Sequence, residues 1–390
     1  MAEEISYVIV TPYSIRKART GGILARLISR TGLEVVAARM FAPSAELVEK
    51  YAAMIVNDPE PRHRATQELI RKYVLANFSP RNGAVPPRVL LLVFKGENAV
   101  NTLRSTVGHI VNERTSGETI RDTYGDYLED ENGNPTYFEP GVLAPPDAAS
   151  AEADLKLWAS YSDTDGGLLD KAVTFPAGAN VEKTLVLIKP DNFRFPNARP
   201  GGVIDLFSRT GLCIIACKVH RMSVAQAEEF YGPVLDVLQD KLRGRSGEIA
   251  RKVLEQELSI TLGDDVQTKL GDLLGPINGR ENWEQIVKFM AGLKPSDCPA
   301  DRRSEPGSEK CIALCYQGID AVRKIREVLG PTDPSKAPPG TIRREFGQTI
   351  MVNAAHASDS AENAEREMGI VQIKENNLKP LVDGWFTKKS

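Results

Sequence analysis

The pentapeptide SRTGL occurs twice in the chain, at residues 29–33 and again at residues 208–212. Each occurrence follows a Gly-Gly pair, at 21–22 and 201–202, and precedes an apolar run, LEVVAARM or LCIIACKV. Self-similarity over so long a period indicates two copies of one folding unit rather than a solenoid. A chain of 390 residues is long enough for two or three domains with cores of their own.

Further segments repeat in the same order, so the two copies can be compared along most of their length. YVIVTP (7–12) corresponds to TLVLIKP (184–190), AVNTLRSTVG (99–108) to AVRKIREVLG (321–330), and GETIR to GTIR. In each copy, β-branched apolar runs alternate with helical patterns. This order predicts an α+β fold, in which helices cover a small, mostly antiparallel sheet of the ferredoxin-like kind.

The repeat also predicts the domain limits. We expect one domain at residues 1–160, a polar, glycine-bearing linker at 161–180, and a second domain at 181–390. The second copy carries about fifty extra residues with a helical pattern, at about 232–281. The first copy has an acidic Asn-Gly stretch, YLEDENGNPTYF (127–138), that is typical of a hairpin or a loop excursion.

Composition excludes several classes of partner. The net charge is −3, so the chain has no basic footprint for nucleic acid. No apolar run approaches the length of a membrane span, and we expect no membrane partner. The acidic N-terminal stretch leads directly into a predicted strand without a signal-peptide pattern, so the expected location is cytoplasmic.

The chain has five cysteines, and four of them form two Cys-x3-Cys pairs, Cys213/Cys217 and Cys311/Cys315. Both pairs lie in apolar runs that are typical of buried strands, so we interpret them as free core residues rather than a disulfide framework. A zinc site is the alternative, although its cysteines usually lie on turns.

The stretch NAAHASDSAENAERE (353–367) places one of only four histidines, His356, between a predicted strand at 349–355 and a predicted helix. Asp359 would be the N-cap of that helix, and Glu362 would complete a capping box. Helix N-termini attract anions, so a neutral imidazole at this point could attack a phosphate. A histidine that only fills a turn is the alternative interpretation.

Three cations of the second copy lie at ends of predicted elements or on an adjoining helix. Lys189 ends the first strand, Arg326 lies on the helix before GPTDP, and Arg343 lies in GTIR. Phosphoryl transfer requires positive charge around the phosphate oxygens and an in-line nucleophile. No G-x-x-x-x-G-K-[ST] sequence occurs, so a P-loop does not supply this chemistry. Solvated surface charges are the alternative for each cation taken singly.

Four motifs of the second copy follow one another in the order of a known family. NAAHASDS matches N-x-x-H-G-S-D-S apart from Ala357, and LIKPD matches V-I-K-P-D. The segment from Arg326 to Pro334 matches V-R-x-x-x-G-x-T-x-P, and PGTIR is present at 339–343. The second copy therefore resembles a nucleoside diphosphate kinase.

The resemblance implies roles for individual residues. His356 would become phosphohistidine, Glu367 would orient its imidazole, and Ser358 would support that pair. Contacts to the nucleotide would come from Lys189, Tyr231, Arg326, Thr332, Arg343 and Asn353. Of these, Lys189 and Arg343 would contact the γ-phosphate, Arg326 and Thr332 the β-phosphate, and Asn353 the sugar. Mg²⁺ would bridge phosphate oxygens with few protein ligands.

The implied reaction passes the γ-phosphate of a nucleoside triphosphate to a nucleoside diphosphate in a ping-pong cycle. A nucleotide-binding regulatory or scaffold protein without efficient turnover is the alternative, because Ala357 and the insertion depart from the family pattern. The family's base-stacking phenylalanine falls near Asn282, next to Trp283.

The first copy resembles the same family but lacks its reactive residues. Thr11 occupies the lysine position, Ala144 the histidine position and Gly141 the asparagine position, while Arg104 and Arg121 persist. We interpret this copy as degenerate, serving as a folded partner or, alternatively, as a phosphate-binding domain. Domains of this family assemble with one another, so pairing of the two copies within the chain and a homo-oligomer are both expected.

Overall fold

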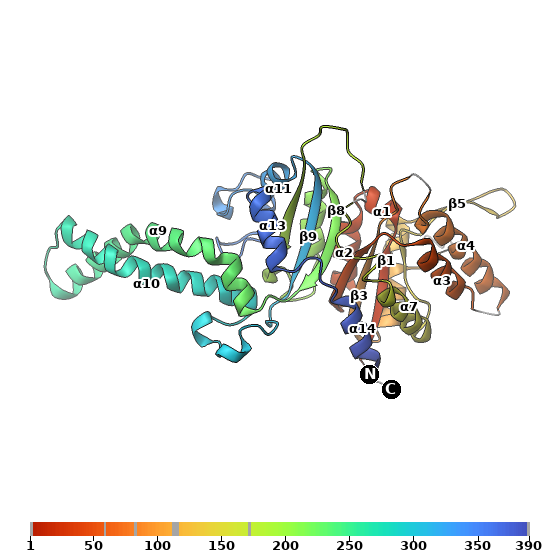
Figure 1. Cartoon of the computed structure of the whole chain (residues 1–390), viewed down its shortest axis with the longest axis horizontal. Coiled ribbons are helices and arrows are strands. Elements are labelled where there is room, and N and C mark those ends of the chain that lie inside the picture. The colour runs from red at the N-terminus through yellow and green to blue at the C-terminus, as the bar shows by residue number, and fades with distance from the viewer. Residues whose placement is uncertain (1–2, 58–59, 82–83, 111–116, 171–172, 388–390) are drawn as a thin grey trace. The chain divides into compact units, whose positions relative to one another are not determined.

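The computed structural model describes residues 3–57, 60–81, 84–110, 117–170 and 173–387. The chain divides into two compact units. The first unit comprises Met1–Val219 and Ile312–Ser390, and the second comprises His220–Cys311. Both copies of the repeated fold lie within the first unit, apart from the insertion (Figure 1).

The first unit contains two four-stranded sheets with the same strand order. The N-terminal sheet has the order β2–β3–β1–β6, and the C-terminal sheet has the order β10–β7–β9–β8. When the strands of each sheet are numbered within their own copy, both orders are 2-3-1-4. The pairings β1–β3, β1–β6, β2–β3, β7–β9 and β7–β10 are antiparallel. The predicted α+β fold of the ferredoxin-like kind is therefore confirmed for both copies. The strands are β1 (Glu3–Val10), β2 (Glu34–Phe41), β3 (Val89–Glu97), β6 (Val142–Leu143), β7 (Val181–Ile188), β8 (Cys213–His220), β9 (Cys311–Ile319) and β10 (Ala355–Ala357).

Helices cover these sheets, and several begin at a side chain that caps them. Ser44 accepts a hydrogen bond from the Leu47 amide at the start of α3, and Asp147 accepts one from the Ser150 amide at the start of α7. In the N-terminal copy the helices are α1 (Pro12–Arg16), α2 (Thr20–Thr31), α3 (Ala45–Ile55), α4 (Pro61–Phe78), α5 (Ala99–Val107), α6 (Ile120–Tyr124) and α7 (Ala148–Ser160). In the C-terminal copy they are α8 (Arg199–Ser208), α11 (Ala321–Leu329), α12 (Ile342–Phe346), α13 (Ala361–Ile370) and α14 (Leu378–Thr387), with short 3-10 turns at Pro190–Asn192 and Pro334–Lys336.

The acidic Asn-Gly stretch of the N-terminal copy forms a hairpin, as predicted. Its strands are β4 (Asp126–Glu129) and β5 (Pro135–Glu139), which pair in antiparallel fashion. The carboxylate of Asp130 accepts hydrogen bonds from the amides of Asn132 and Asn134 and so fixes the turn.

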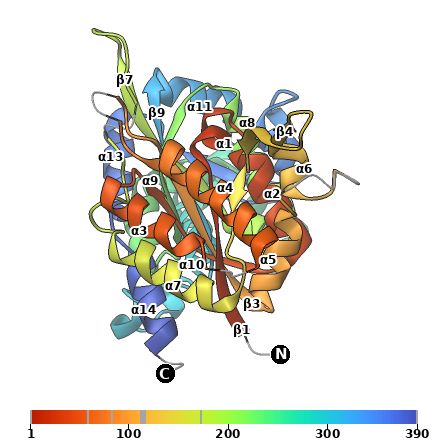
Figure 2. The same ribbon diagram turned by 90° about the vertical axis from the view of Figure 1, so that its right-hand side faces the viewer.

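The two faces of the N-terminal sheet belong to different cores because successive side chains of a strand point to opposite faces. Tyr7 and Ile9 of β1 pack with α3, α4 and α7, which lie over one face in Figure 2. Val8 and Val10 belong to a larger cluster on the other face. That cluster also contains Val186, Ile204 and Tyr316, so one continuous core joins the two copies.

Helices α2 and α8 cross at the paired glycines that the sequence repeats. A Cβ atom on Gly21 would lie 2.6 Å from the carbonyl oxygen of Gly201, and one on Gly201 would lie 2.6 Å from the Cα atom of Ala25. Such distances leave no space for a side chain at either position. Gly21 and Gly201, the first residue of each Gly-Gly pair, therefore permit backbone-to-backbone contact between the two copies.

The segment that joins the copies lies between their outer strands. The Gly167 amide donates to the Met40 carbonyl of β2, and the Leu169 amide donates to the Ile215 carbonyl of β8. The buried guanidinium of Arg39 donates to the carbonyls of Ser162 and Glu375. The C-terminal residues are thereby tied to the N-terminal copy, and Leu378 and Val382 of α14 are part of its core.

The second unit is built on two long helices, α9 (Val224–Leu258) and α10 (Asp264–Ala291), followed by 3-10 turns at Pro295–Asp297 and Ala300–Arg302. The helices contact each other along their length and include the predicted insertion at 232–281. A capping box between Ser223 and Gln226 begins α9. The predicted domain limits at 160 and 181 stay predictions.

Candidate active site

His356 lies in the middle of a strand, which differs from the sequence prediction. The predicted strand at 349–355 is wrong, because residues 349–352 form bends and β10 is Ala355–Ala357. The backbone of Ala354 has φ of 69°, a left-handed conformation that interrupts an extended strand. His356 pairs with Leu187 of β7, so its imidazole extends from a strand of the sheet rather than from a loop.

The helix after His356 begins one residue later than predicted. Ser360, not Asp359, is the N-cap of α13, and its Oγ accepts a hydrogen bond from the Asn363 amide at 3.0 Å. Ser360 has the extended backbone that an N-cap requires. The Asp359 carboxylate instead accepts from the Asn363 side chain, so the predicted capping box with Glu362 is wrong.

The His356 imidazole is held by a buried carboxylate. Its Nε2 atom lies 2.9 Å from Oε2 of Glu367, and the same oxygen accepts a hydrogen bond from Ser358 Oγ at 2.6 Å. Glu367 and Ser358 are buried, whereas 23% of the His356 side chain is exposed. A carboxylate can only accept, so in the neutral imidazole Nε2 carries the proton and Nδ1 the lone pair.

Lys189 lies directly after β7 and is buried. Its Nζ donates to Asn353 Oδ1 at 2.9 Å and to the Met351 carbonyl at 2.5 Å. The pKa of Lys189 is lowered to about 8, chiefly by burial; Asp191 opposes the shift and Arg343 adds to it. The lysine is thus a strong hydrogen-bond donor whose charge titrates close to neutral pH.

Asn353 and Arg343 connect the other predicted residues to this centre. The Asn353 side chain donates to the Thr332 carbonyl at 3.1 Å, which brings the Thr332 loop to Lys189. The Arg343 guanidinium donates to the carbonyls of Gly330 and Ala355. Ala355 directly precedes His356 on β10, so the Arg343 guanidinium lies against the strand that carries the histidine.

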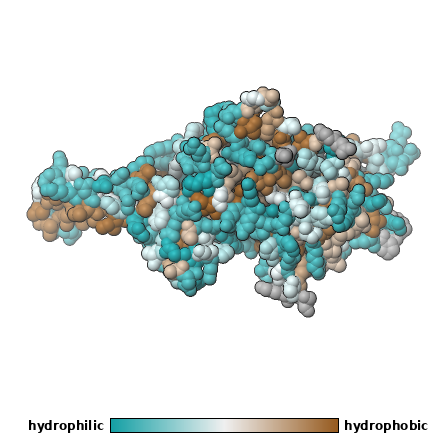
Figure 3. All heavy atoms as spheres, viewed as in Figure 1, coloured by the Kyte–Doolittle hydropathy of each residue, from teal (hydrophilic) through white to brown (hydrophobic). Residues whose placement is uncertain are grey.

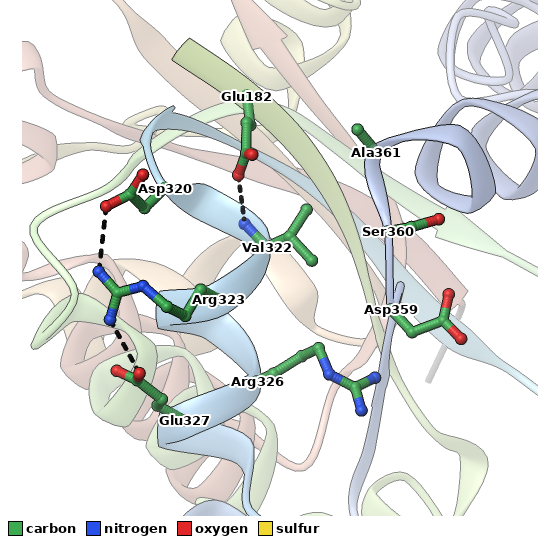
Figure 4. Close-up of a pocket in the computed structure, with 9 residues that line it drawn as sticks. All are labelled: Glu182, Asp320, Val322, Arg323, Arg326, Glu327, Asp359, Ser360 and Ala361. Atoms are coloured by element: carbon green, nitrogen blue, oxygen red, sulfur yellow. Dashed lines mark hydrogen bonds and ion pairs between the residues drawn. The ribbon is translucent and has the colours of Figure 1, made fainter. Parts of the chain in front are cut away.

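Arg326 is exposed on α11 and lines a cavity of about 630 Å³. In Figure 4 its guanidinium extends toward the segment that carries Asp359, whereas Arg323 on the same helix is bonded to Asp320 and Glu327. Ser360 and Ala361 at the start of α13 also line the cavity. The arginine is therefore available to an anion near the N-terminus of α13.

Tyr231 differs from the other eight predicted residues because it belongs to the second unit. Its ring lies 4.9 Å from that of Phe230, measured between centroids, and its carbonyl accepts a hydrogen bond from Trp283 Nε1 at 2.9 Å. Trp283 is buried. The contacts of Trp283 are those of a core residue, which disfavours a role for it in place of the family's base-stacking phenylalanine.

Sequence reasoning missed two residues that hold Lys189 in place. Asn192 donates from its side chain to the carbonyls of Lys189 and Ala354, which joins the end of β7 to the start of β10. Asp191 is buried beside Lys189 and forms an ion pair with Arg199 at 3.4 Å. Both residues directly follow the LIKP segment, and this proximity to Lys189 was the available signal.

The N-terminal copy has a leucine where the C-terminal copy has His356. Thr11 donates its amide to the Gly141 carbonyl as Lys189 does to Ala354, so Thr11 occupies the lysine position as predicted. Leu143 pairs with Ile9 as His356 pairs with Leu187. The assignments of Ala144 to the histidine position and of Gly141 to the asparagine position are therefore each wrong by one residue.

A buried carboxylate lies beside Thr11 in the N-terminal copy. Thr11 Oγ1 donates to Glu139 at 3.0 Å, and the Tyr73 hydroxyl donates to the same carboxylate at 2.7 Å. Burial raises the pKa of Glu139. Arg121 donates to the carbonyls of Gly108 and Val142, the same contacts that Arg343 makes in the other copy. This arginine supports the fold and does not by itself indicate a phosphate site.

Metal ligands are sparse throughout the described ranges. They contain no group of three or more His, Cys, Asp or Glu residues arranged to hold a metal ion. The five cysteines are free thiols, of which all but Cys213 are buried. An ion held mainly by phosphate oxygens and water needs no such cluster, so the site residues fit Mg²⁺ that arrives with a nucleotide.

Among the described helices, none is long and apolar enough to cross a membrane.

A histidine on the sheet has a buried carboxylate partner, a lysine and an arginine lie against the same strands, and a second arginine lines a cavity at the start of α13. This arrangement is that of a phosphotransferase that acts on nucleotides. The family model for nucleoside diphosphate kinase matches residues 4–134 and 301–376, more than half of the chain, and the chain belongs to this family. One matched region lies in each copy, which confirms the tandem arrangement.

Similar proteins match about half of the chain. A nucleoside diphosphate kinase of Bdellovibrio bacteriovorus is 30% identical over 191 residues, which cover 49% of this chain and 92% of the relative. One from Pyrobaculum aerophilum is 30% identical over 198 residues, covering 48% of this chain and 93% of the relative. The solved structure of the Aquifex aeolicus nucleoside diphosphate kinase is 26% identical, with a TM-score of 0.31, and covers 51% of this chain and 98% of that chain.

Proposed function

We propose that the C-terminal copy transfers the γ-phosphate of a nucleoside triphosphate to a nucleoside diphosphate through a phosphohistidine at His356. The observation that carries this proposal is the hydrogen-bonded chain from Ser358 through Glu367 to the imidazole Nε2. It directs the lone pair of the neutral imidazole to Nδ1, the nucleophile that a ping-pong cycle requires.

In the first half-reaction, Nδ1 of His356 attacks the γ-phosphorus. The Nδ1–P bond forms while the bond from phosphorus to the bridging oxygen breaks, and the nucleoside diphosphate leaves with that electron pair. The imidazole gains positive charge, which the Glu367 carboxylate stabilises at Nε2. A second nucleoside diphosphate then attacks the phosphohistidine through its terminal oxygen, which regenerates neutral His356.

The cations of the site would stabilise charge on the transferring phosphoryl group. Lys189 and Arg343 lie next to the strand that carries His356, so they suit the γ-phosphate. Arg326 lies on α11 and Thr332 on the loop that follows this helix, and both suit the β-phosphate. Asn353 suits the sugar hydroxyls. Tyr231 remains a proposed nucleotide contact on the family resemblance alone. Bound Mg²⁺ would supply additional neutralisation of phosphate charge.

The N-terminal copy is proposed to be a permanent folded partner without activity. Leu143 offers no nucleophile, Thr11 offers no charge, and the Glu139 carboxylate beside Thr11 would repel a phosphate. The shared hydrophobic core and the close crossing of α2 with α8 support a structural role. The pairing of the copies within the chain is thus proposed to stabilise the active copy.

A two-stage labelling experiment tests this function. The full-length protein is incubated with γ-labelled ATP and Mg²⁺, freed of nucleotide, and then given unlabelled GDP. We expect label on the protein that is acid-labile and base-stable, followed by its quantitative appearance in GTP. A regulatory or scaffold protein would bind nucleotide but carry no label, and that result would replace the proposed function with the alternative.

A further inference from the structure

The α9–α10 hairpin is held together by small residues on its inner face. A Cβ atom on Gly275 would lie 2.7 Å from the Cα atom of Arg243, and one on Gly279 would lie 2.5 Å from that of Gln239. Gly271 likewise faces the backbone of Arg243. The two backbones therefore approach closely, and the large apolar residues of both helices are not needed between them.

Those large apolar residues are instead exposed. Of the fifteen exposed large apolar side chains in the described part of the chain, eight fall between positions 237 and 277. They are Val237, Ile249, Val253, Leu258, Ile260, Leu273, Leu274 and Ile277. Leu273 and Ile277 are 69% and 67% exposed. Figure 3 shows the apolar surface gathered along one side of the hairpin, with hydrophilic residues on the other side.

The spacing of these residues is that of a helix-packing seam. Val266, Leu270, Leu273 and Ile277 of α10 follow one another at intervals of four, three and four residues. On a helix this spacing forms one continuous stripe, as in a coiled coil. The stripe lies on a different face from Gly271, Gly275 and Gly279, which face α9, so it has no packing role inside the hairpin.

The charge of the hairpin disfavours a membrane or nucleic acid as the occupant of this side. Between Val224 and Ala291 the sequence has eight Lys and Arg residues and twelve Asp and Glu residues. Anionic lipid surfaces and phosphate backbones attract basic, not acidic, helices. A protein surface of matching shape and mixed charge is the remaining class of partner.

The size of the apolar side suits pairing with an identical hairpin. A helix of 28 residues, the length of α10, is about 42 Å long, and two helices side by side are about 20 Å wide. One side of the hairpin thus offers about 800 Å², which is the area each partner contributes to an ordinary stable interface. Two hairpins related by a two-fold axis would pack these sides into a four-helix bundle.

We propose that two copies of this chain associate through the apolar sides of their α9–α10 hairpins, forming an intermolecular four-helix bundle with Leu273 and Ile277 in its interior. The bundle removes from water the side chains that the single chain leaves exposed. This inference rests on the second unit alone and does not depend on the proposed phosphotransfer.

Sedimentation equilibrium of the full-length protein tests the proposal. We expect a mass of twice 42.7 kDa at about 100 µM, because interfaces of this size have micromolar or tighter dissociation constants. The Leu273→Asp/Ile277→Asp variant should sediment as a monomer, since it would bury four uncompensated charges per dimer. Leu128→Asp is the control, because Leu128 is also an exposed apolar residue but lies on the β4–β5 hairpin, and this variant should remain dimeric.

Each outcome decides the proposal. Helical circular dichroism and the melting temperature establish that the double variant is folded, and both substituted positions are exposed, so its fold should persist. If that variant is misfolded, Leu273→Gln/Ile277→Gln replaces it and should weaken dimerisation at least tenfold. A wild-type protein that is monomeric at 100 µM, or a folded variant that dimerises as the wild type does, would overturn the proposal.

Discussion

Glu367 Oε2, on helix α13, lies 2.9 Å from His356 Nε2, on strand β10, so each group is positioned by its own element. The carboxylate is buried and shared with the hydroxyl of Ser358, so it cannot turn away to solvent. The imidazole is therefore held in one orientation before any nucleotide binds, which is the preorganisation that fast phosphoryl transfer needs.

The first prediction concerns this pair. Glu367→Gln retains the shape of the side chain but removes the charge that stabilises the imidazolium formed during attack. We expect the rate of phosphoenzyme formation to fall on the order of a hundredfold. Rapid-quench labelling measures this rate. Glu365→Gln, an exposed change on the same helix, should leave it unchanged; equal rates for all three proteins would show that Glu367 has no part in the reaction.

The second prediction concerns the charge of Lys189. Because burial lowers the pKa of this lysine to about 8, its Nζ loses a proton as pH rises through that value, and its attraction for phosphate is lost. We therefore expect kcat/KM to fall above about pH 8. In Lys189→Arg the guanidinium stays charged, so the fall should disappear even if the maximal rate is lower. An alkaline limb that persists in this variant would assign the titration to another group.

The third prediction concerns contact between the two copies. In Gly21→Ala, the added Cβ would lie 2.6 Å from the Gly201 carbonyl oxygen, so α2 and α8 must separate. We expect a loss of about 1–3 kcal/mol in the free energy of unfolding, measured by urea titration. Gly384→Ala, in α14 with no atom within 4 Å of the new Cβ, should be neutral or slightly stabilising. Equal stabilities of the two variants would contradict a close crossing at Gly21.

The fourth prediction concerns the need for the N-terminal copy. Residues 178–390 expressed alone would expose Val186, Ile204 and other members of the shared core, so we expect aggregation, self-association or a lowered melting temperature. Residues 1–160 added in trans should partly restore stability. A fragment that associates no further than the full-length protein, melts with it and turns over at its rate would refute a structural role for the partner.

The sequence was sufficient to predict the parts of the site that lie in motifs or at strand ends. Lys189 and Asn353 come together because the end of β7 meets the residues before β10, and the motifs LIKPD and NAAHASDS indicated both residues. The glycine pairs marked corresponding helices in the two copies. Their role in the crossing could not be predicted, since it depends on how one copy packs against the other.

Each feature that the sequence did not reveal has a physical reason. The strand before His356 was placed too early because a left-handed residue such as Ala354 leaves no mark in the sequence. Ala144 rather than Leu143 was matched with His356 because β6 has only two residues and carries little pattern. The exposure of Leu273 and Ile277 was also invisible, since a stripe of leucines usually indicates a core.

The most direct test of the account is the label carried by His356→Ala after incubation with γ-labelled ATP and Mg²⁺. His63→Ala changes an exposed histidine of α4 in the N-terminal copy and is the matched control. We predict acid-labile, base-stable label on the wild type and on His63→Ala, and none on a folded His356→Ala protein. Label retained by His356→Ala at the wild-type level would contradict the assignment of His356 as the nucleophile.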